Sequence, residues 1–201
     1  GARGITCQKI GEAEVMADSG LDDILIAYNL IGPQRAERLG ALARRVTLTV
    51  AADNPTTLET YTQAGRPPGR PPRGVVECDP GPQRADPHLQ FRGFLFYPTE
   101  TSWPETQKFY DEALAGVREA GLEAPMVSTG GTPNLVNLGN LKGATEHRAG
   151  TYIFNDRMMI ACGRATLEDC ALHIYTTVVS RAGPDRGILD AGSKTLTSDT
   201  G

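Results

Sequence analysis

The sequence predicts an α/β fold built from strands and helices in alternation. Apolar runs of strand length, such as residues 24–31, are nearly continuous, as expected for parallel strands that are buried on both faces. Segments with apolar residues at helical spacing, such as residues 33–45, follow these runs. A repeated strand and helix unit is typical of a closed barrel and of an open doubly wound sheet, and the pattern alone does not choose between them.

The first half of the chain repeats this unit three times and then adds a fourth strand. A glycine at position 20 ends the first helix, and Asn54 followed by Pro55 begins the third. Residues 66–73 are rich in proline and arginine, which predicts a loop. The expected strands are 4–10, 24–31, 46–51 and 75–78, and the expected helices are 11–17, 33–45 and 54–65.

The second half continues the pattern with one interruption. Too few residues precede the next strand, 89–97, to hold a helix, so one repeat is expected to lack its helix. An amphipathic helix is expected over 104–121, and further strands over 124–127 and 151–154 with a short helical turn over 137–143 between them. From residue 171 the pattern changes to strands, 171–180 and 187–191, joined by a turn.

Composition excludes several classes of protein. The 201 residues are 39% hydrophobic, which is enough for one sizeable core, and no apolar run approaches the length of a membrane span. A net charge of −4 without a basic face argues against nucleic acid as a partner. The cysteines lie far apart, without the spacing of a zinc site, so we expect reduced thiols in a cytoplasmic protein. They are Cys7, Cys78, Cys162 and Cys170.

A stretch of small residues, Val127 to Thr132, follows one of the expected strands. It reads Val-Ser-Thr-Gly-Gly-Thr, and backbone N–H groups and hydroxyls of such a turn can close around an anion. The alternative is an ordinary glycine-rich turn, because short glycine motifs recur by chance. We expect a phosphate group here.

Five motifs in order carry a resemblance to a known family. They are residues 4–14, Glu77-Cys78-Asp79 with Gly81 and Arg84, residues 127–133, residues 148–152 and residues 189–194. Together they resemble the D-threonine aldolase and D-serine dehydratase-like family, whose members bind pyridoxal 5′-phosphate. The resemblance implies a truncated (β/α)8 TIM barrel of the alanine racemase type over residues 1–165. The beginning of a C-terminal β domain is expected over residues 166–201.

The resemblance also implies a set of cofactor-binding residues. Gln8 matches a glutamine that contacts the cofactor, and Arg84 matches an arginine near the cofactor ring or the substrate. Thr132, Gly150 and Thr151 match positions that hold the phosphate, and the remaining residues shape the site around them. The full set is Gln8, Arg84, Ser128, Gly130, Gly131, Thr132, Gly150, Thr151 and Tyr152.

Two parts of the family's catalytic machinery are expected to lie outside this chain. The lysine that forms the Schiff base is on a strand that would precede residue 1, and the ligands of the divalent metal ion would follow Gly201. No catalytic or metal-binding residue is therefore assigned, and the fragment alone is expected to be inactive. The lysines Lys9, Lys108, Lys142 and Lys194 do not match the Schiff-base position, and His88, His147 and His173 lack the spacing of metal ligands.

The implied reaction of the intact relative is that of a carbon–carbon lyase. It cleaves a D-β-hydroxy-α-amino acid to glycine and an aldehyde, with a metal ion to polarise the β-hydroxyl. The alternatives are a deaminating lyase of the D-serine dehydratase type and a catalytically inactive fragment. A small D-amino acid as substrate, no membrane partner and a homodimer in the intact protein are also expected.

Overall fold

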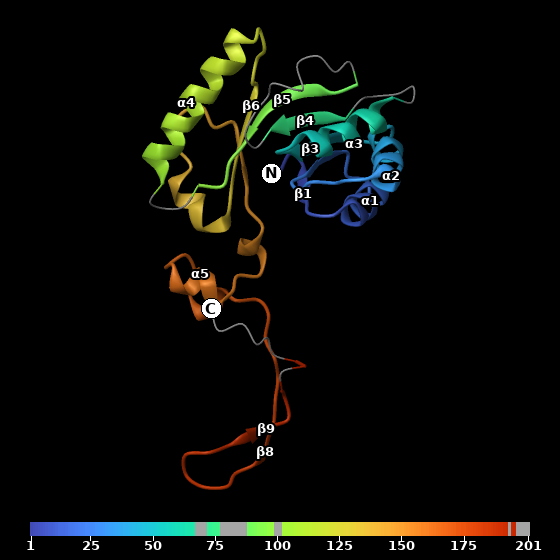
Figure 1. The fold of residues 1–201 in the computed structure, drawn as a ribbon. Coiled ribbons are helices and arrows are strands. Elements are labelled where there is room, and N and C mark those ends of the chain that lie inside the picture. Colours follow the sequence, from blue (N-terminus) through green and yellow to red (C-terminus); the bar gives the residue numbers. More distant parts are fainter. Residues whose placement is uncertain (67–71, 77–87, 99–101, 193, 196–201) are drawn as a thin grey trace. The chain divides into compact units, whose positions relative to one another are not determined.

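The structure is a computed structural model that describes residues 1–66, 72–76, 88–98, 102–192 and 194–195, with the side chains of residues 73–76 excepted. The chain divides into two compact units, Gly1–Arg148 and Ala149–Gly201 (Figure 1). Each unit is described by itself below.

The first unit is built on one parallel sheet whose seven strands lie in the order of the sequence. All six neighbouring pairs are parallel, and β1 and β7 are the edges of the sheet. The strands are β1 (Ile5–Cys7), β2 (Asp23–Ile26), β3 (Thr47–Ala52), β4 (Arg73–Val76), β5 (Gln90–Leu95), β6 (Met126–Gly130) and β7 (Glu146–Arg148). A strand order that never reverses is that of a barrel, because a doubly wound sheet reverses its order at a switch point.

The helices of this unit are α1 (Ile10–Asp18), α2 (Pro33–Ala43), α3 (Pro55–Gly65) and α4 (Trp103–Glu119), with a 3-10 helix, η2 (Thr132–Asn137), between β6 and β7. Local sequence explains where they begin. The Asn54 side chain accepts a hydrogen bond from the N–H of Thr57 at 2.9 Å and so caps α3. At the start of α1, the Glu12 carboxylate accepts from the N–H groups of Gln8 and Lys9.

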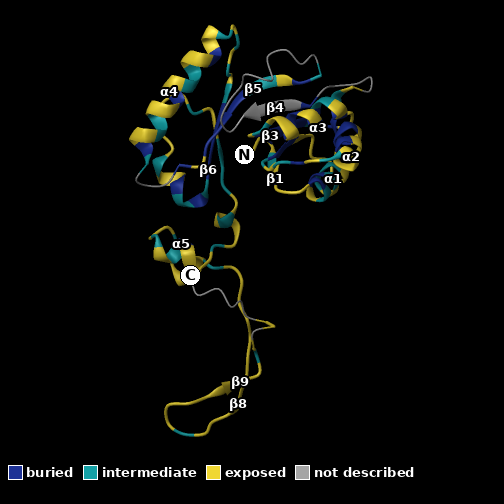
Figure 2. Cartoon of the chain, in the orientation of Figure 1, coloured by how far each residue is buried: buried dark blue, intermediate teal, exposed yellow. Residues whose placement is uncertain are grey.

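Hydrophobic side chains show that these helices cover only one face of the sheet. Ile24, Ile26 and Val50 pack with α1, α2 and α3 in one cluster, and Phe94 and Val127 pack with α4 in another. The opposite face, called the inner face below, carries a smaller cluster of Leu25, Ala51 and Leu95, against which Ala27 and Met126 pack. Figure 2 shows the buried stretches of β5 and β6. Helices on one face alone are the second feature of a barrel, so the unit is part of an α/β barrel.

A buried tyrosine ties α3 to the sheet. The Tyr61 hydroxyl donates to the carbonyl of Ala51 at 2.8 Å and accepts from the N–H of Leu30 at 3.3 Å. The side chain is fully buried, and burial raises the pKa of its hydroxyl far above the ordinary value. The hydroxyl therefore stays protonated and connects β3, α3 and the segment after β2.

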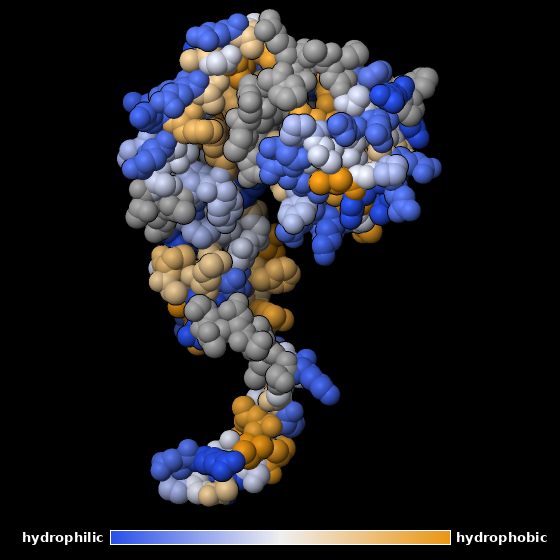
Figure 3. Space-filling view, viewed as in Figure 1, coloured by the Kyte–Doolittle hydropathy of each residue, from blue (hydrophilic) through white to orange (hydrophobic). Residues whose placement is uncertain are grey.

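The second unit holds short elements and little core. They are the 3-10 helices η3 (Thr151–Ile153) and η4 (Leu167–Asp169), the helix α5 (Arg157–Ala161), and the strands β8 (Val178–Ser180) and β9 (Ile188–Leu189), which pair antiparallel. Among its described residues Met159 is the one buried side chain. Hydrophobic side chains gather on the surface of β8 and β9 (Figure 3), and Tyr175 is almost fully exposed.

Several expected elements differ from the observed ones. The strand expected over 151–154 is wrong, because Thr151–Ile153 is a 3-10 turn; the strand is β7, whose Glu-His-Arg sequence lacks an apolar run. The strand expected to end at Val127 continues to Gly130, because Ser128 and Thr129 pair with β7. The short helix lies at Thr132–Asn137 and not at 137–143, and within 171–180 only Val178–Ser180 form a strand.

Other expectations are not decided by the structure. The repeat without a helix falls on residues 77–87, which lie outside the described residues. The expected domain boundary at residue 165 stays a prediction, and the compact units divide at Arg148. Cys7, Cys162 and Cys170 are free thiols, and Cys78 lies outside the described part. No helix in the described ranges has the length and apolar character needed to cross a membrane.

Replacing Tyr61 by Phe tests the role of this hydroxyl. We expect Tyr61→Phe to lower the free energy of unfolding by about 1–3 kcal/mol, because the carbonyl of Ala51 loses its donor in a buried setting. Urea unfolding followed by circular dichroism measures the change. Tyr28, whose side chain is exposed, provides the matched control, and Tyr28→Phe should stay within about 0.5 kcal/mol of the original chain. Equal stability of the two variants would contradict the assignment.

Candidate functional site

The polar residues of the first unit gather where its parallel strands end. Parallel strands share one direction, so the residues that follow them meet at the same edge of the sheet. Gln8 follows β1, Asp53 follows β3, Tyr97 comes two residues after β5, and Gly131 and Thr132 follow β6. We call this the carboxyl edge.

The glycine pair at the end of β6 forms a tight turn onto η2. Gly131 has a φ of +98°, a conformation that favours glycine. Its N–H donates to the carbonyl of Arg148 at 2.8 Å, and its carbonyl accepts from the N–H of Asn134 at 3.0 Å. Thr132, the next residue, is buried. The turn is thereby joined both to β7 and to η2.

Tyr97 and Arg148 lie directly against this turn. A Cβ atom added at Gly131 would stand 2.6 Å from the Tyr97 hydroxyl oxygen, and one added at Gly130 would stand 2.7 Å from Nη2 of Arg148. Tyr97 is nevertheless 67% exposed. A side chain at either position would have to displace the Tyr97 ring or the Arg148 guanidinium, and at Gly131 the positive φ also favours glycine.

On the inner face, three polar side chains form a hydrogen-bonded group. Arg148 donates from Nη1 to the Ser128 hydroxyl at 2.5 Å and from Nη2 to the carbonyl of Phe96 at 3.0 Å. Ser128 in turn donates to a carboxylate oxygen of Glu146 at 2.6 Å. The register of β6 and β7 places Ser128 opposite Glu146 and Gly130 opposite Arg148, so all point to one face. The Ser128 hydroxyl links the Arg148 guanidinium to the Glu146 carboxylate and holds the guanidinium in place.

On the helix-facing side of the same strands, His147 joins β7 to the glycine turn. Its Nδ1 lies 2.8 Å from the Thr129 hydroxyl and its Nε2 lies 3.0 Å from the carbonyl oxygen of Gly131. A carbonyl only accepts, so Nε2 carries the proton, and in the neutral ring Nδ1 then accepts from Thr129. Burial lowers the pKa of His147, and the nearby Arg148 charge lowers it further, against the opposite effect of the Gly131 carbonyl. The neutral imidazole is the favoured form.

Asn134 closes the turn from the side of η2. Its Nδ2 donates to the carbonyls of Pro98 at 2.7 Å and Gly130 at 3.2 Å. Exchanging the amide atoms would place Oδ1 against two carbonyl oxygens, so the orientation is fixed. Oδ1 is buried and has no hydrogen-bond partner within the described residues. A single donor, such as a water molecule, would satisfy it.

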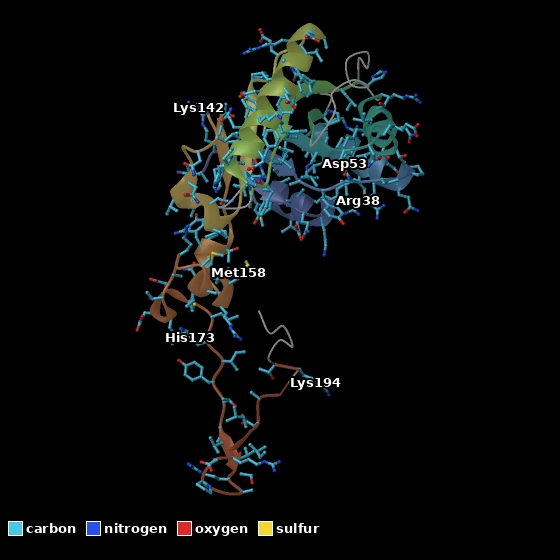
Figure 4. The ribbon with its side chains drawn as sticks, turned by 60° about the vertical axis from the view of Figure 1, so that its left-hand side comes forward. Arg38, Asp53, Lys142, Met158, His173 and Lys194 are labelled. Carbon is cyan, nitrogen blue, oxygen red and sulfur yellow. The ribbon has the colours of Figure 1, made fainter. Side chains whose placement is uncertain are left out.

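A second polar group lies farther along the carboxyl edge. Asp53 accepts from the Asn29 amide at 2.6 Å and from the Asn54 amide at 2.5 Å, and Figure 4 shows its place after β3. Two amide donors stabilise the carboxylate and fix its direction. In the described part of the chain no group of three acidic, histidine or cysteine side chains is arranged to hold a metal ion.

Four of the predicted cofactor residues are near neighbours in the sequence and lie at one place in the structure. Ser128, Gly130, Gly131 and Thr132 all lie at the end of β6. Gln8 is exposed just after β1, at the same edge of the sheet. The other four cannot be compared: Arg84 lies outside the described residues, and Gly150, Thr151 and Tyr152 lie in the second unit, so their convergence with Thr132 stays a prediction.

Sequence analysis missed three residues of the turn, namely Tyr97, Asn134 and His147. Tyr97 ends an expected strand, and its place at a strand end was a usable signal. His147 was considered only as a metal ligand, because the strand that contains it was not recognised. Nothing in the sequence marks Asn134, whose role depends on the fold of η2 around the turn.

The four lysines occupy different surroundings. Lys9 follows Gln8 and immediately precedes α1. Lys108 is on α4, where its ammonium lies 4.0 Å from the Glu112 carboxylate. Lys142 lies in the segment between η2 and β7, and Lys194 is in the second unit (Figure 4). Among these four lysines, only Lys9 is next in sequence to a residue of the carboxyl edge.

Comparison with known proteins adds relatives over the whole chain. No protein-family model matches the chain. It is 30% identical to a D-threonine aldolase from Arthrobacter sp. and 29% identical to a D-threo-3-hydroxyaspartate dehydratase from Delftia sp. (strain HT23). Both matches cover 100% of this chain and 61% of the relative, so the chain spans about three fifths of the curated relatives it matches.

Solved structures of related proteins also resemble this chain. The D-threonine aldolase from Filomicrobium marinum superimposes with a TM-score of 0.82 at 26% identity, covering 100% of this chain and 62% of that one. Alanine racemase from Corynebacterium glutamicum shares the fold, with a TM-score of 0.58 at 19% identity over 75% of this chain and 46% of that one.

The one-directional parallel sheet, its helices on a single face and its polar carboxyl edge define an alanine-racemase-like α/β barrel. The full-length similarities then narrow the class. Over its whole length the chain is similar to a D-threonine aldolase and to a D-threo-3-hydroxyaspartate dehydratase, which confirms the resemblance carried by its motifs.

The lowered pKa of His147 predicts a dependence of stability on pH. Between the ordinary histidine value of 6.5 and the lower folded value, the unfolded chain takes up the proton first. The contribution to the free energy of unfolding is therefore complete above 6.5 and is lost as the pH falls through the folded pKa. Urea unfolding at about pH 7.5 and about pH 5 measures the loss, which should be smaller in His147→Gln. An equal loss in both chains would show that His147 does not contribute.

Proposed function

We propose that this chain is the cofactor-binding part of a pyridoxal-phosphate-dependent lyase that cleaves D-β-hydroxy-α-amino acids to glycine and an aldehyde. The observation that carries the proposal is the Gly130–Gly131 turn at the carboxyl edge, with Tyr97 and Arg148 against it. The full-length relatives named as D-threonine aldolase and 3-hydroxy-D-aspartate aldolase supply the reaction class.

The residues of the turn fit the chemistry of a phosphorylated aromatic ring. A phosphate dianion needs N–H and O–H donors, and an aromatic ring needs a flat neighbour or a directed polar contact. The Cβ positions of the glycine pair are occupied by a phenol and a guanidinium, and the next residue is a threonine. Donors, a cation and an aromatic side chain from three segments of the chain thus lie against one turn, which suits this cofactor.

Each residue has a proposed task in binding. The Thr132 hydroxyl and the backbone of the Gly130–Thr132 turn hold the phosphate, and a part for Gly150 and Thr151 stays a prediction of the resemblance. Ser128 keeps the Arg148 guanidinium directed along the inner face. Gln8, Arg84 and Tyr152 contact the ring side of the site. When bound, the cofactor supplies an electron sink for cleavage of a bond at the substrate's α-carbon.

A second candidate reaction is supported by other relatives. The Delftia protein is named a dehydratase, and a D-serine dehydratase from Dictyostelium discoideum is 36% identical over 91 residues, 42% of this chain. A dehydratase removes the α-proton and expels the β-hydroxyl, whereas an aldolase breaks the bond between the α-carbon and the β-carbon. A small D-amino acid is the proposed substrate in both cases. A divalent metal ion, a homodimer and a cytoplasmic location in the intact protein stay predictions.

The role of Thr132 in phosphate binding can be measured directly. We expect Thr132→Val to weaken binding of pyridoxal 5′-phosphate about tenfold, because one charge-assisted hydrogen bond is lost. Binding of pyridoxal, which lacks the phosphate, should not change. Absorbance titration of each ligand gives both dissociation constants. Thr56→Val, an exposed threonine on α3, is the matched control. Unchanged affinity in Thr132→Val would remove Thr132 from the site.

A second experiment separates cofactor binding from catalysis. We expect this chain to bind pyridoxal 5′-phosphate reversibly, without a stoichiometric lysine adduct after borohydride reduction, because no lysine matches the family's Schiff-base position. Mass spectrometry of the reduced and digested protein locates any adduct. A trapped adduct on Lys9, accompanied by turnover of D-threonine, would show that the chain is itself an active enzyme.

A further inference from the structure

We propose that His147 is a positioning residue for the Gly130–Gly131 turn, and that it sets the affinity of the turn for the cofactor phosphate by fixing the Gly131 carbonyl. The inference rests on the proposed function and deepens it, because it names a residue that touches neither cofactor nor substrate. His147 lies on the helix-facing side of β7, opposite the face that carries Arg148.

Three hydrogen bonds fix the peptide groups of Gly131. Its N–H donates to the carbonyl of Arg148 at 2.8 Å, and its carbonyl accepts from Asn134 N at 3.0 Å and from His147 Nε2 at 3.0 Å. Of these donors and acceptors, only the imidazole belongs to a side chain. Of the two groups that donate to the Gly131 carbonyl, His147 is therefore the one that can be replaced without altering the backbone.

The carbonyl of Gly131 and the N–H of Thr132 belong to the same peptide unit. Because this unit is planar and trans, the two groups point in opposite directions. A carbonyl held toward His147 therefore turns the Thr132 N–H to the other side of the turn. The binding of a phosphate through this peptide unit would therefore depend on the imidazole, although the phosphate and the imidazole are not in contact.

The geometry asks for histidine in one neutral tautomer. Nδ1 must accept from Thr129, whose side chain is 2% exposed, and Nε2 must donate to Gly131. A neutral imidazole does both at once, with a rigid ring between the two atoms. Asparagine retains a polar atom near the position of Nδ1 but not of Nε2, whereas glutamine reaches the position of Nε2. The two amides therefore separate the Thr129 contact from the Gly131 contact.

Binding of two ligands to three forms of the chain tests the proposal. Pyridoxal 5′-phosphate and pyridoxal are titrated into the original chain, His147→Gln and His147→Asn. We expect His147→Asn to bind the phosphorylated ligand about five- to tenfold more weakly and to bind pyridoxal unchanged, because the Gly131 contact is lost. His147→Gln should stay within about twofold for both ligands, since one donor to the carbonyl is kept.

Two results would overturn the proposal. Equal loss of affinity for both ligands would mean that His147 supports the fold only. Unchanged phosphate-dependent affinity in His147→Asn would mean that the turn does not need the imidazole. If the original chain binds pyridoxal 5′-phosphate no more tightly than pyridoxal, the proposed function itself is wrong. If the original chain prefers the phosphorylated ligand and His147→Asn keeps that preference, only the inference about His147 is wrong.

A spectroscopic readout tests the local arrangement without any ligand. A long-range 1H–15N spectrum of the original chain should show His147 protonated at Nε2 and unprotonated at Nδ1 near neutral pH. The same tautomer should disappear from the spectrum of Thr129→Val, or lose population in it, because Nδ1 no longer has its donor. A population of the opposite tautomer in the original chain would overturn the proposal.

Discussion

The pairing of β6 with β7 is the interaction on which the candidate site depends. It sets Ser128 opposite Glu146, Thr129 opposite His147 and Gly130 opposite Arg148. Because side chains alternate along a strand, one register creates two separate polar groups, one on each face of the sheet. The inner group directs a guanidinium past Gly130, and the outer group holds the turn that follows. The short polar strand β7 therefore organises both sides of the carboxyl edge.

Burial of the hydroxyl residues at the end of β6 restricts which neighbours they can have. Ser128, Thr129 and Thr132 are buried hydroxyl residues at the end of a strand whose beginning packs in apolar clusters. Buried polar groups are costly unless they are hydrogen-bonded, so each must find a partner on β7 or on η2. The partners named above meet that demand for Ser128 and Thr129. The proposed phosphate site at this end of β6 rests on these hydroxyls and on the resemblance of the motifs.

The sequence predicts the fold well where apolar periodicity is strong. The alternation around residues 24–65 is correct apart from the exact ends, and Asn54 caps α3 at the expected place. Prediction failed at β7, because Glu146, His147 and Arg148 carry no apolar signal and are held by pairing with a distant segment. The choice between barrel and open sheet also needed the structure, since it depends on strand order and on which face the helices cover. Within the site, residue types around Gly130 and Gly131 indicated the turn, but Tyr97, Asn134 and His147 reach it only through tertiary contacts.

The alternation along β7 also limits how this part of the chain can vary during evolution. Insertions within the exposed residues 138–140 lengthen a surface connection and leave the facing of each strand residue unchanged. A single residue inserted within Glu146–Arg148 would instead exchange the sides of the imidazole and the guanidinium, and both polar groups would be lost together. A change in length is thus tolerable in that exposed segment and not within the strand.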